Sequence, residues 1–363
     1  MKMILQKIAA WLYGMVIGVR NALFDKDILK GREYDIPIIC IGNITAGGTG
    51  KTPMVELVVS HFSKSYNVAV LSRGYGRKTR GYRVVDGLFD HYSDVGDEPL
   101  QIKRKFPNVP VVVCERRTEG IERIMNQFPE VNMIIMDDGF QHRWVKPYLN
   151  IVMIDFSRPI DKDSFMPNGQ LRDSIDSLDR ANIFVFTKCP ENLLQRDMSL
   201  MVAGLKKKPS QATFFTRPRC KEVRSLESGA PVMLPDNCRV IAMSGIGNND
   251  AFFRGLSSRY NVVGTLGFED HYQYRITDAE LLTKALEEHP EAMFFITTEK
   301  DAVKLSSLEG FPEELRNRIF YECIGMEFVP TQYTTSAQIE QTLYALLDNE
   351  IKRFNDDAHI RGC

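Results

Sequence analysis

Short apolar segments, each bounded by polar residues, glycine or proline, recur through the first half of the chain. They occupy residues 37–41, 68–71, 109–113, 133–136, 151–154 and 183–186. These segments are continuously apolar rather than alternating, which is typical of central parallel strands covered on both faces. Stretches with helical periodicity, at residues 55–62 and 119–127, separate several of them. This alternation predicts a doubly wound α/β fold with a mainly parallel sheet.

The same pattern begins again after about residue 190. Expected strands lie at residues 212–216, 240–243, 262–265 and 294–297, and an expected helix at 278–288. The pattern therefore predicts a core domain at residues 31–190 and a second, smaller α/β domain at 191–363. The final helix, at about residues 336–354, is compatible with packing on either domain.

The N-terminal segment, residues 1–30, contains a shorter apolar run from Ile8 to Val19, with Trp11 and Tyr13 inside it and basic residues at both ends. A membrane-spanning helix needs about 20 apolar residues, and a signal peptide needs a small-residue cleavage motif that this segment lacks. The aromatic residues and basic flanks favour a helix that lies in a membrane interface. A first helix packed on the protein's own core is the alternative.

The composition is that of an ordinary globular protein, with 44% hydrophobic and 26% charged residues among 363. This length is sufficient for two packed domains. A formal net charge of -1 excludes a strongly basic protein that coats nucleic acid through bulk electrostatics. Seven cysteines without a C-x-x-C pair are expected to be reduced thiols in a cytosolic compartment.

A glycine-rich segment follows the first expected strand and precedes an expected helix. In such a loop the backbone N–H groups wrap a polyphosphate, a lysine reaches the β- and γ-phosphates, and a threonine hydroxyl binds Mg²⁺. The usual motif is G-x-x-x-x-G-K-[ST], and this chain has threonine in place of the first glycine. A glycine-rich turn without a ligand is the alternative. The expected phosphate-binding residues are Thr45, Ala46, Gly47, Gly48, Thr49, Gly50, Lys51 and Thr52.

Two other classes of nucleotide-binding protein share parts of this loop. Dimerising ATPases place a signature lysine before the two glycines, where this chain has Ala46. GTPases carry an Asn-Lys-x-Asp element after a late strand, and the nearest candidate, T-K-C-P at residues 187–190, lacks both the asparagine and the aspartate. Each class misses its distinctive residue, and neither is excluded.

Charged residues follow two other expected strands. Asp137 and Asp138 come directly after one of them, where P-loop enzymes place a second Mg²⁺ contact. An acidic turn that caps the next segment is the alternative. Arg73 and Arg77 follow the strand at residues 68–71 and suit a phosphorylated acceptor or the transferred phosphoryl group. A solvated basic loop is the alternative there.

A set of motifs in order resembles the tetraacyldisaccharide 4'-kinase family. The motifs are G-N-I-T-x-G-G-T-G-K-T-P, L-S-R-G-Y-G-R, G-D-E-P, D-D-G-F-Q-H, T-K-C-P, Asp270-His271 and T-E-K-D-A-V-K, within residues 37–304. Threonine at position 45 is itself what this family shows. The resemblance implies transfer of the ATP γ-phosphate to the 4'-hydroxyl of a tetraacylated glucosamine disaccharide 1-phosphate in lipid A biosynthesis.

The resemblance also implies the cofactors ATP and Mg²⁺ and a second domain that closes over the nucleotide. It implies an N-terminal helix at the cytoplasmic face of the bacterial inner membrane, with no nucleic acid and no protein partner. A nucleotide-dependent switch or partner-binding ATPase without a small-molecule acceptor is the alternative function.

Individual residues receive roles from the resemblance. Asp97 is implied as the base with His271 as its partner, and Lys51 as the phosphate contact. The family often has an acidic residue before its arginine, whereas this chain has Arg116-Arg117, which leaves open which of the two points inward. The implied metal contacts are Thr52, Glu98 and Asp138, and the implied substrate contacts are Arg73, Arg77, Arg117 and Gln141.

The G-D-E-P motif also carries a chemical argument of its own. It places two adjacent carboxylates, Asp97 and Glu98, where Pro99 can start a helix. One carboxylate can then serve the acceptor hydroxyl and the other the metal. His271 is distant in sequence, so it reaches Asp97 only if the two domains close. An aspartate that merely caps a helix is the alternative.

Overall fold

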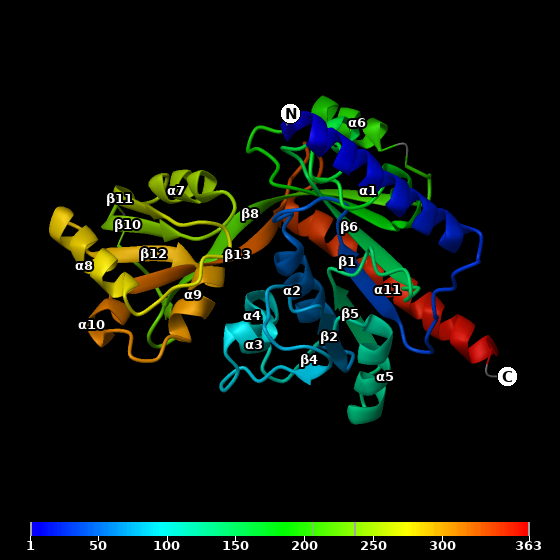
Figure 1. Ribbon diagram of the computed structural model, residues 1–363, viewed down its shortest axis with the longest axis horizontal. Coiled ribbons are helices and arrows are strands. Elements are labelled where there is room, and N and C mark those ends of the chain that lie inside the picture. Colours follow the sequence, from blue (N-terminus) through cyan, green and yellow to red (C-terminus); the bar gives the residue numbers. More distant parts are fainter. Residues whose placement is uncertain (1, 206, 236, 362–363) are drawn as a thin grey trace.

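The computed structural model describes residues 2–205, 207–235 and 237–361. Its strands are β1 (Ile38–Gly42), β2 (Val68–Ser72), β3 (Arg83–Val84), β4 (Val111–Val113), β5 (Met133–Asp137), β6 (Leu149–Asp155), β7 (Ile183–Thr187), β8 (Ala212–Ser225), β9 (Pro231–Val232), β10 (Arg239–Ser244), β11 (Asn261–Gly267), β12 (Phe294–Thr298) and β13 (Ile319–Phe328). They form one continuous sheet in the order β11-β10-β12-β13-β8-β7-β6-β1-β5-β2-β4-β3, with β9 paired to β8. Figure 1 shows the sheet divided between two lobes. We call the part built on β1 to β7 the first lobe and the part built on β10 to β13 the second lobe.

Helices lie on both sides of the sheet in each lobe (Figure 1). The α-helices are α1 (Lys2–Asp25), α2 (Lys51–Phe62), α3 (Tyr92–Val95), α4 (Asp97–Lys105), α5 (Arg117–Gln127), α6 (Gln195–Gly204), α7 (Asn249–Ser257), α8 (Asp278–Glu288), α9 (Glu299–Ser306), α10 (Glu313–Arg316) and α11 (Ser336–Arg361). Two 3-10 helices, at Ile160–Lys162 and Ile175–Arg180, lie between β6 and β7.

The first lobe is a doubly wound sheet. Its central strand β1 lies between β5 and β6, is parallel to both, and is buried throughout. Ile39 and Ile41 pack on the face covered by α2, α4 and α11, whereas Ile38 and Cys40 pack on the face covered by α5 and α6. Only β3, at the edge, is antiparallel to its neighbour within this lobe. The predicted α/β fold with a mainly parallel sheet is confirmed.

The second lobe repeats this arrangement on a smaller scale. β10 lies between β11 and β12, and β13 follows β12, all in parallel pairs. Ile241 and Met243 face α8, α9 and α10, whereas Val240 and Ala242 face α7. The alternating burial of β10 therefore gives this lobe two small apolar cores.

β8 and β13 connect the two lobes. β8 is parallel to β7 over residues 212–215 and then antiparallel to β13 as far as Ser225. The strand expected at 212–216 is thus the beginning of a longer one. The predicted domain boundary near residue 190 stays a prediction, but α6 lies beyond it and packs on the first lobe through Met198. The final helix, α11, also packs on the first lobe, through Leu343 and Leu347.

The cysteine side chains described next are free thiols and form no disulfide bond. Burial raises the pKa of Cys40 and Cys189 to about 12, which keeps these thiols protonated and unreactive. Cys363 lies outside the described residues. Free thiols occur at Cys40, Cys114, Cys189, Cys220 and Cys323, in agreement with the expected reduced state.

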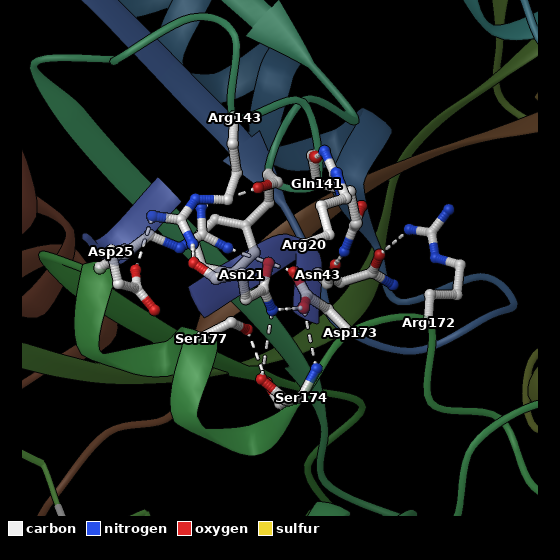
Figure 2. Close-up of polar contacts among 12 residues, drawn as sticks. Arg20, Asn21, Asp25, Asn43, Gln141, Arg143, Arg172, Asp173, Ser174 and Ser177 are labelled. Atoms are coloured by element: carbon white, nitrogen blue, oxygen red, sulfur yellow. Dashed lines mark hydrogen bonds and ion pairs between the residues drawn. The ribbon is translucent and has the colours of Figure 1, made fainter. Parts of the chain in front are cut away.

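α1 contacts the first lobe with one face and exposes the other. Asn21 is buried and donates a hydrogen bond of 2.7 Å to Asp173 Oδ1, and Tyr13 donates one of 3.0 Å to the Arg172 carbonyl. Figure 2 shows Asn21 among these polar partners. Ala10 and Phe24 of this helix are buried against the first lobe, whereas most of its apolar side chains are exposed. The exposed apolar residues are Met3, Ile4, Leu5, Ile8, Trp11, Leu12, Met15, Val16 and Val19.

Candidate active site

The glycine-rich loop joins β1 to α2, and its backbone makes a tight turn. Gly47 and Gly50 have φ angles of 96° and 81°, a conformation that residues with a side chain rarely adopt. α2 begins at Lys51, directly after Gly50. Within the described chain, the N–H groups of Gly48 and Thr49 donate to no backbone carbonyl. Backbone donors next to a helix N-terminus bind phosphate, so this loop has the geometry that its sequence predicts.

Asn43 is fully buried and holds the loop in place through hydrogen bonds of its side chain and its carbonyl. Its amide nitrogen donates to Thr49 Oγ1 at 2.8 Å, and its amide oxygen accepts from Lys51 Nζ at 3.5 Å. Its carbonyl accepts a hydrogen bond of 2.6 Å from Gln141 Nε2. The role of Asn43 is not apparent from the sequence, because its partners are fixed by the fold of the loop rather than by a spacing.

A second segment of chain lies against the first half of the loop. Thr45 forms an isolated antiparallel bridge with Leu171, and the Ala46 N–H donates to the Gln170 carbonyl at 2.7 Å. The N–H of Ala46, a predicted phosphate contact, therefore already has a partner in the protein. The loop donors left for a phosphate include those of the residues that follow it.

Asp138 lies beside the phosphate-binding loop, next to Lys51. Arg172 binds it with both guanidinium nitrogens, at 3.1 and 2.8 Å, and Lys51 Nζ lies 3.6 Å from its Oδ1. The same guanidinium donates to Asn43 Oδ1, as Figure 2 shows. Burial alone would raise the pKa of Asp138, but Lys51 and Arg172 outweigh it and hold the pKa at about 2. Asp138 is therefore a fixed anion, and Arg172 is a site residue that no sequence motif indicated.

Asp137 differs from its neighbour because one of its oxygens has no partner. The carboxylate is fully buried, and its Oδ2 accepts a hydrogen bond of 3.0 Å from Ser72. Its buried Oδ1 has no hydrogen-bond partner in the described chain. Burial, followed by the nearby charges of Glu98 and Asp138, raises the pKa of Asp137 to about 7.

These carboxylates fit a divalent cation. An unpartnered buried oxygen beside other carboxylates is stabilised by a hard cation such as Mg²⁺. No group of three candidate ligands among His, Cys, Asp and Glu is already assembled in the described residues. Mg²⁺ usually binds through one or two carboxylates together with phosphate oxygens.

Asp97 and His271 meet between the two lobes. Asp97 is the first residue of α4 and is buried, and its Oδ1 accepts the Glu98 N–H at 2.9 Å. His271 Nδ1, from the second lobe, lies 3.4 Å from Asp97 Oδ2. Lys300 and Lys304 of α9 lie 3.7 and 3.8 Å from the same oxygen.

The charges around Asp97 keep it ionised. Burial by itself would raise the pKa of this carboxyl. The contact with His271 and the charges of Lys300 and Lys304 outweigh burial and lower the pKa below its usual range. Asp97 is therefore a carboxylate at neutral pH. The second-lobe residues that keep Asp97 ionised are His271, from one segment, and Lys300 and Lys304, from α9.

Comparison with known proteins identifies the family. The sequence profile described as tetraacyldisaccharide-1-P 4'-kinase matches residues 2–347. The chain belongs to this family. The tetraacyldisaccharide 4'-kinase of Phocaeicola vulgatus is 37% identical over 330 residues, covering 89% of this chain and 90% of that protein. That of Porphyromonas gingivalis is 37% identical over 320 residues, covering 85% and 88%.

A solved structure agrees with the sequence comparison. LpxK from Aquifex aeolicus, crystallised in complex with ATP, is 27% identical and has a TM-score of 0.72. The match covers 97% of this chain and 100% of that one. The resemblance that the sequence motifs indicated is confirmed, and the fold of this chain is similar to that of LpxK.

The arginines of the family's motifs have different surroundings in this chain. Arg117 is buried and donates to the Cys114 carbonyl at 2.7 Å, whereas Arg116 is exposed, so Arg117 is the one that points inward. Arg77 is paired with Glu115 at 2.7 Å and is thus engaged with the protein. Arg73 is exposed.

His142 marks a cationic region beside the site. Burial lowers the pKa of His142 to about 4, and the charges of Arg117, Arg20 and Arg73 act in the same direction. The imidazole is therefore neutral at physiological pH. An anion is the natural ligand of such a region. Arg20 also donates to the Gln141 carbonyl at 2.5 Å, which links α1 to this region (Figure 2).

Proposed function

We propose that this chain transfers the γ-phosphate of ATP to the 4'-hydroxyl of a tetraacylated glucosamine disaccharide 1-phosphate. The observation that carries this proposal is the position of Asp137. Its buried Oδ1 has no hydrogen-bond partner among the described residues, and besides burial the charges of Glu98, Asp138 and Lys51 act on its pKa. Asp137 therefore lies near charged residues of both the phosphate-binding loop and the helix that begins with Asp97.

The first lobe supplies the nucleotide contacts. The loop donors from Gly47 to Gly50 and the ammonium of Lys51 bind the phosphates, as in other P-loop proteins. Thr52, Glu98 and the Asp137-Asp138 pair are the residues that would hold Mg²⁺. Bound Mg²⁺ supplies neutralisation of charge on the β- and γ-phosphate oxygens. Asp137 joins the predicted set because its buried Oδ1 has no hydrogen-bond partner among the described residues.

Asp97 acts on the acceptor. Its Oδ2 accepts the proton of the 4'-hydroxyl while that oxygen bonds to the γ-phosphorus and the bond from phosphorus to ADP breaks. His271 orients the carboxylate and stabilises its charge. Lys51 neutralises the negative charge of the transferred phosphoryl group. The products are ADP and a 4'-phosphomonoester, with the proton on Asp97.

We infer that the N-terminal helix holds the site at a membrane. α1 is long and apolar enough to cross a bilayer by length and composition. One of its faces is fixed to the first lobe by Tyr13 and Asn21, which leaves the apolar face for a surface contact. Trp11 lies on that face, and indole rings are enriched at membrane interfaces. We therefore place the protein peripherally at the cytoplasmic face of the inner membrane.

An open apolar hollow lies along the same helix. Its volume is about 380 Å³. Acyl chains of the lipid acceptor suit such a surface, and Arg20 at its edge suits an anionic headgroup. The lining residues are Met15, Val16, Val19, Arg20, Leu23 and Leu29.

The proposal is tested by phosphate transfer itself. The purified chain is incubated with γ-labelled ATP, Mg²⁺ and the detergent-dispersed lipid disaccharide 1-phosphate. Label in a lipid phosphomonoester is the expected result. Release of inorganic phosphate without labelled lipid would instead favour an ATPase that acts on no small-molecule acceptor. An Asp97→Asn variant controls for transfer by a contaminating kinase.

A further inference from the structure

The first turn of α9 is anchored to the centre of the second lobe by Asp301. This residue is fully buried. Its Oδ2 accepts hydrogen bonds from the Gly245 N–H at 2.9 Å and from Thr298 Oγ1 at 2.7 Å. Its own N–H donates to Thr298 Oγ1 at 3.1 Å, which completes the N-terminal cap of the helix. Asp301 therefore has a fixed position relative to β10 and β12.

Lys304 lies one turn further along α9 and is almost as deeply buried, with only 2% of its side chain exposed. Its Nζ is 3.6 Å from Asp301 Oδ1 and 3.8 Å from Asp97 Oδ2. Neither Lys304 Nζ nor Asp301 Oδ1 has a hydrogen-bond partner in the described chain. Because an isolated buried ammonium is strongly unfavourable, these two carboxylates are what allow the lysine to be buried there.

The contact with Asp97 involves the oxygen that the chemistry needs. Asp97 Oδ1 accepts the Glu98 N–H, and Oδ2 is the oxygen proposed to accept the proton of the acceptor hydroxyl. Lys300 also contacts Oδ2, but it is shared with Glu98 at 3.3 Å, and Glu98 is a proposed Mg²⁺ contact. Lys304 has no such competing partner. It is therefore the cation whose position depends only on the fold of the second lobe and on Asp97.

We propose that Lys304, held by Asp301, is a positioning residue for the phosphotransfer reaction that orients the Asp97 carboxylate when the two lobes are together. This inference rests on the proposed role of Asp97 as base. An ion pair within α9 that only stabilises the second lobe is the competing explanation. The two explanations predict different effects of a Lys304 substitution in a protein that lacks the Asp97 carboxylate.

Other contacts hold α4 and α9 together without Lys304. Arg104 donates to the Val303 carbonyl at 3.3 Å and to Ser306 Oγ at 2.7 Å. Lys105 lies 3.4 Å from Glu299 Oε2. Lys105 is thus a matched control, because it is a lysine in the same helix pair that contacts Glu56 and Glu299 rather than Asp97.

The experiment compares Lys304→Met and Lys105→Met by their kcat for the lipid acceptor and their Kd for ATP. Displacement of a reacting group by about 1 Å costs up to about 10²-fold in rate. We expect a loss of kcat of up to that size in Lys304→Met, with an unchanged Kd for ATP. Lys105→Met is expected to keep its kcat. An equal loss in Lys105→Met would attribute the effect to the helix contact and overturn the proposal.

A double variant separates positioning from stability. In an Asp97→Ala background, Lys304→Met should lower the remaining transfer no further, because Lys304 acts through Asp97. A loss as large as in the wild-type background would overturn the proposal. If Asp97→Ala alone keeps normal turnover, it is the proposed base that fails, and this outcome is distinct.

Asp301→Asn provides a second test in case Lys304→Met does not fold. It keeps the shape of the side chain and removes the charge that holds Lys304. We expect a lower kcat with unchanged ATP binding and a cooperative thermal transition. A folded Asp301→Asn protein with wild-type kcat would overturn the proposal even where Lys304→Met cannot be measured.

Discussion

His271 Nδ1 lies 3.4 Å from Asp97 Oδ2, although the two residues belong to different lobes. A pair that works as one unit loses most of its function when either member is removed. We expect Asp97→Ala and His271→Ala each to lower turnover by about 10²- to 10⁴-fold. The double variant should be little worse than the poorer single variant. Independent, multiplicative losses in steady-state assays would contradict the pairing.

Lys51 contributes more to the reaction than to the fold. Its Nζ lies 3.6 Å from Asp138 and 3.5 Å from Asn43, and such a loop lysine mainly neutralises phosphate charge. We expect Lys51→Ala to abolish transfer while thermal unfolding stays cooperative and close to that of the wild type. Normal turnover in a folded Lys51→Ala protein would remove the loop from the mechanism.

Arg172 orients Asp138 through two hydrogen bonds that a lysine cannot reproduce. We expect Arg172→Lys to weaken ATP binding about tenfold, equivalent to about 1.4 kcal/mol. Equilibrium titration with a fluorescent ATP analogue measures this change. Arg217→Lys is the control, because Arg217 pairs with Glu327, at 2.7 Å, rather than with Asp138. Equal weakening in both variants would show that the Arg172 contact is not specific.

Glu299 gives the fold a pH dependence. Burial, followed by the charge of Glu56, raises the pKa of Glu299 to about 7, although Lys105 acts in the opposite direction. A carboxyl whose folded pKa lies above its unfolded pKa stabilises the protein fully at low pH, and this stabilisation is lost as the pH rises through 7.

The corresponding experiment is urea unfolding between pH 5 and pH 8, at about half-unit steps. We expect Glu299→Gln to remove up to about 3 kcal/mol of the decline in unfolding free energy. The variant should therefore be more stable than the wild type above pH 7. Parallel pH profiles for the two proteins would show that Glu299 is ionised throughout.

The exposed face of α1 is expected to bind membranes. Trp11 is 63% exposed on that face, and a charge placed there opposes insertion at the interface. We expect Trp11→Glu to reduce sedimentation with anionic vesicles while ATP binding persists. Phe89→Glu is the matched control, because Phe89 is an exposed aromatic residue outside α1. Vesicle binding that is unchanged in Trp11→Glu would exclude this face as the membrane contact.

The sequence predicts elements whose signals are local. The helix expected at 278–288 is α8 at the same residues, because its apolar positions recur with helical spacing. β13 is not predicted, and the length of β8 is not either, because both depend on pairing between segments about 100 residues apart. Pairing at that distance leaves little trace in the local pattern.

The contrast between local sequence signals and distant contacts also applies to the active site. The phosphate-binding loop is predicted because its glycines and lysine follow one another in sequence. Asp97 and His271 come from the family resemblance, since nothing local connects them. Asn43 and Arg172 acquire their roles only when the fold brings them beside Lys51 and Asp138. The partners of Arg172 are distant in sequence, and those of Asn43 depend on the conformation of the loop, so neither residue has a spacing that identifies its role.

The ribbon formed by β8 and β13 also restricts how the enzyme can move. Both lobes are hydrogen-bonded to this ribbon, because β8 continues from its pairing with β7 into its pairing with β13. Two rigid bodies on a shared antiparallel ribbon can bend or twist relative to each other, but they cannot slide without breaking the ladder. His271 and Lys304 belong to the same lobe, so any bending of the ribbon would change their distances to Asp97 together. Any opening of the two lobes would therefore bend this ribbon and leave the pairing of its strands unchanged.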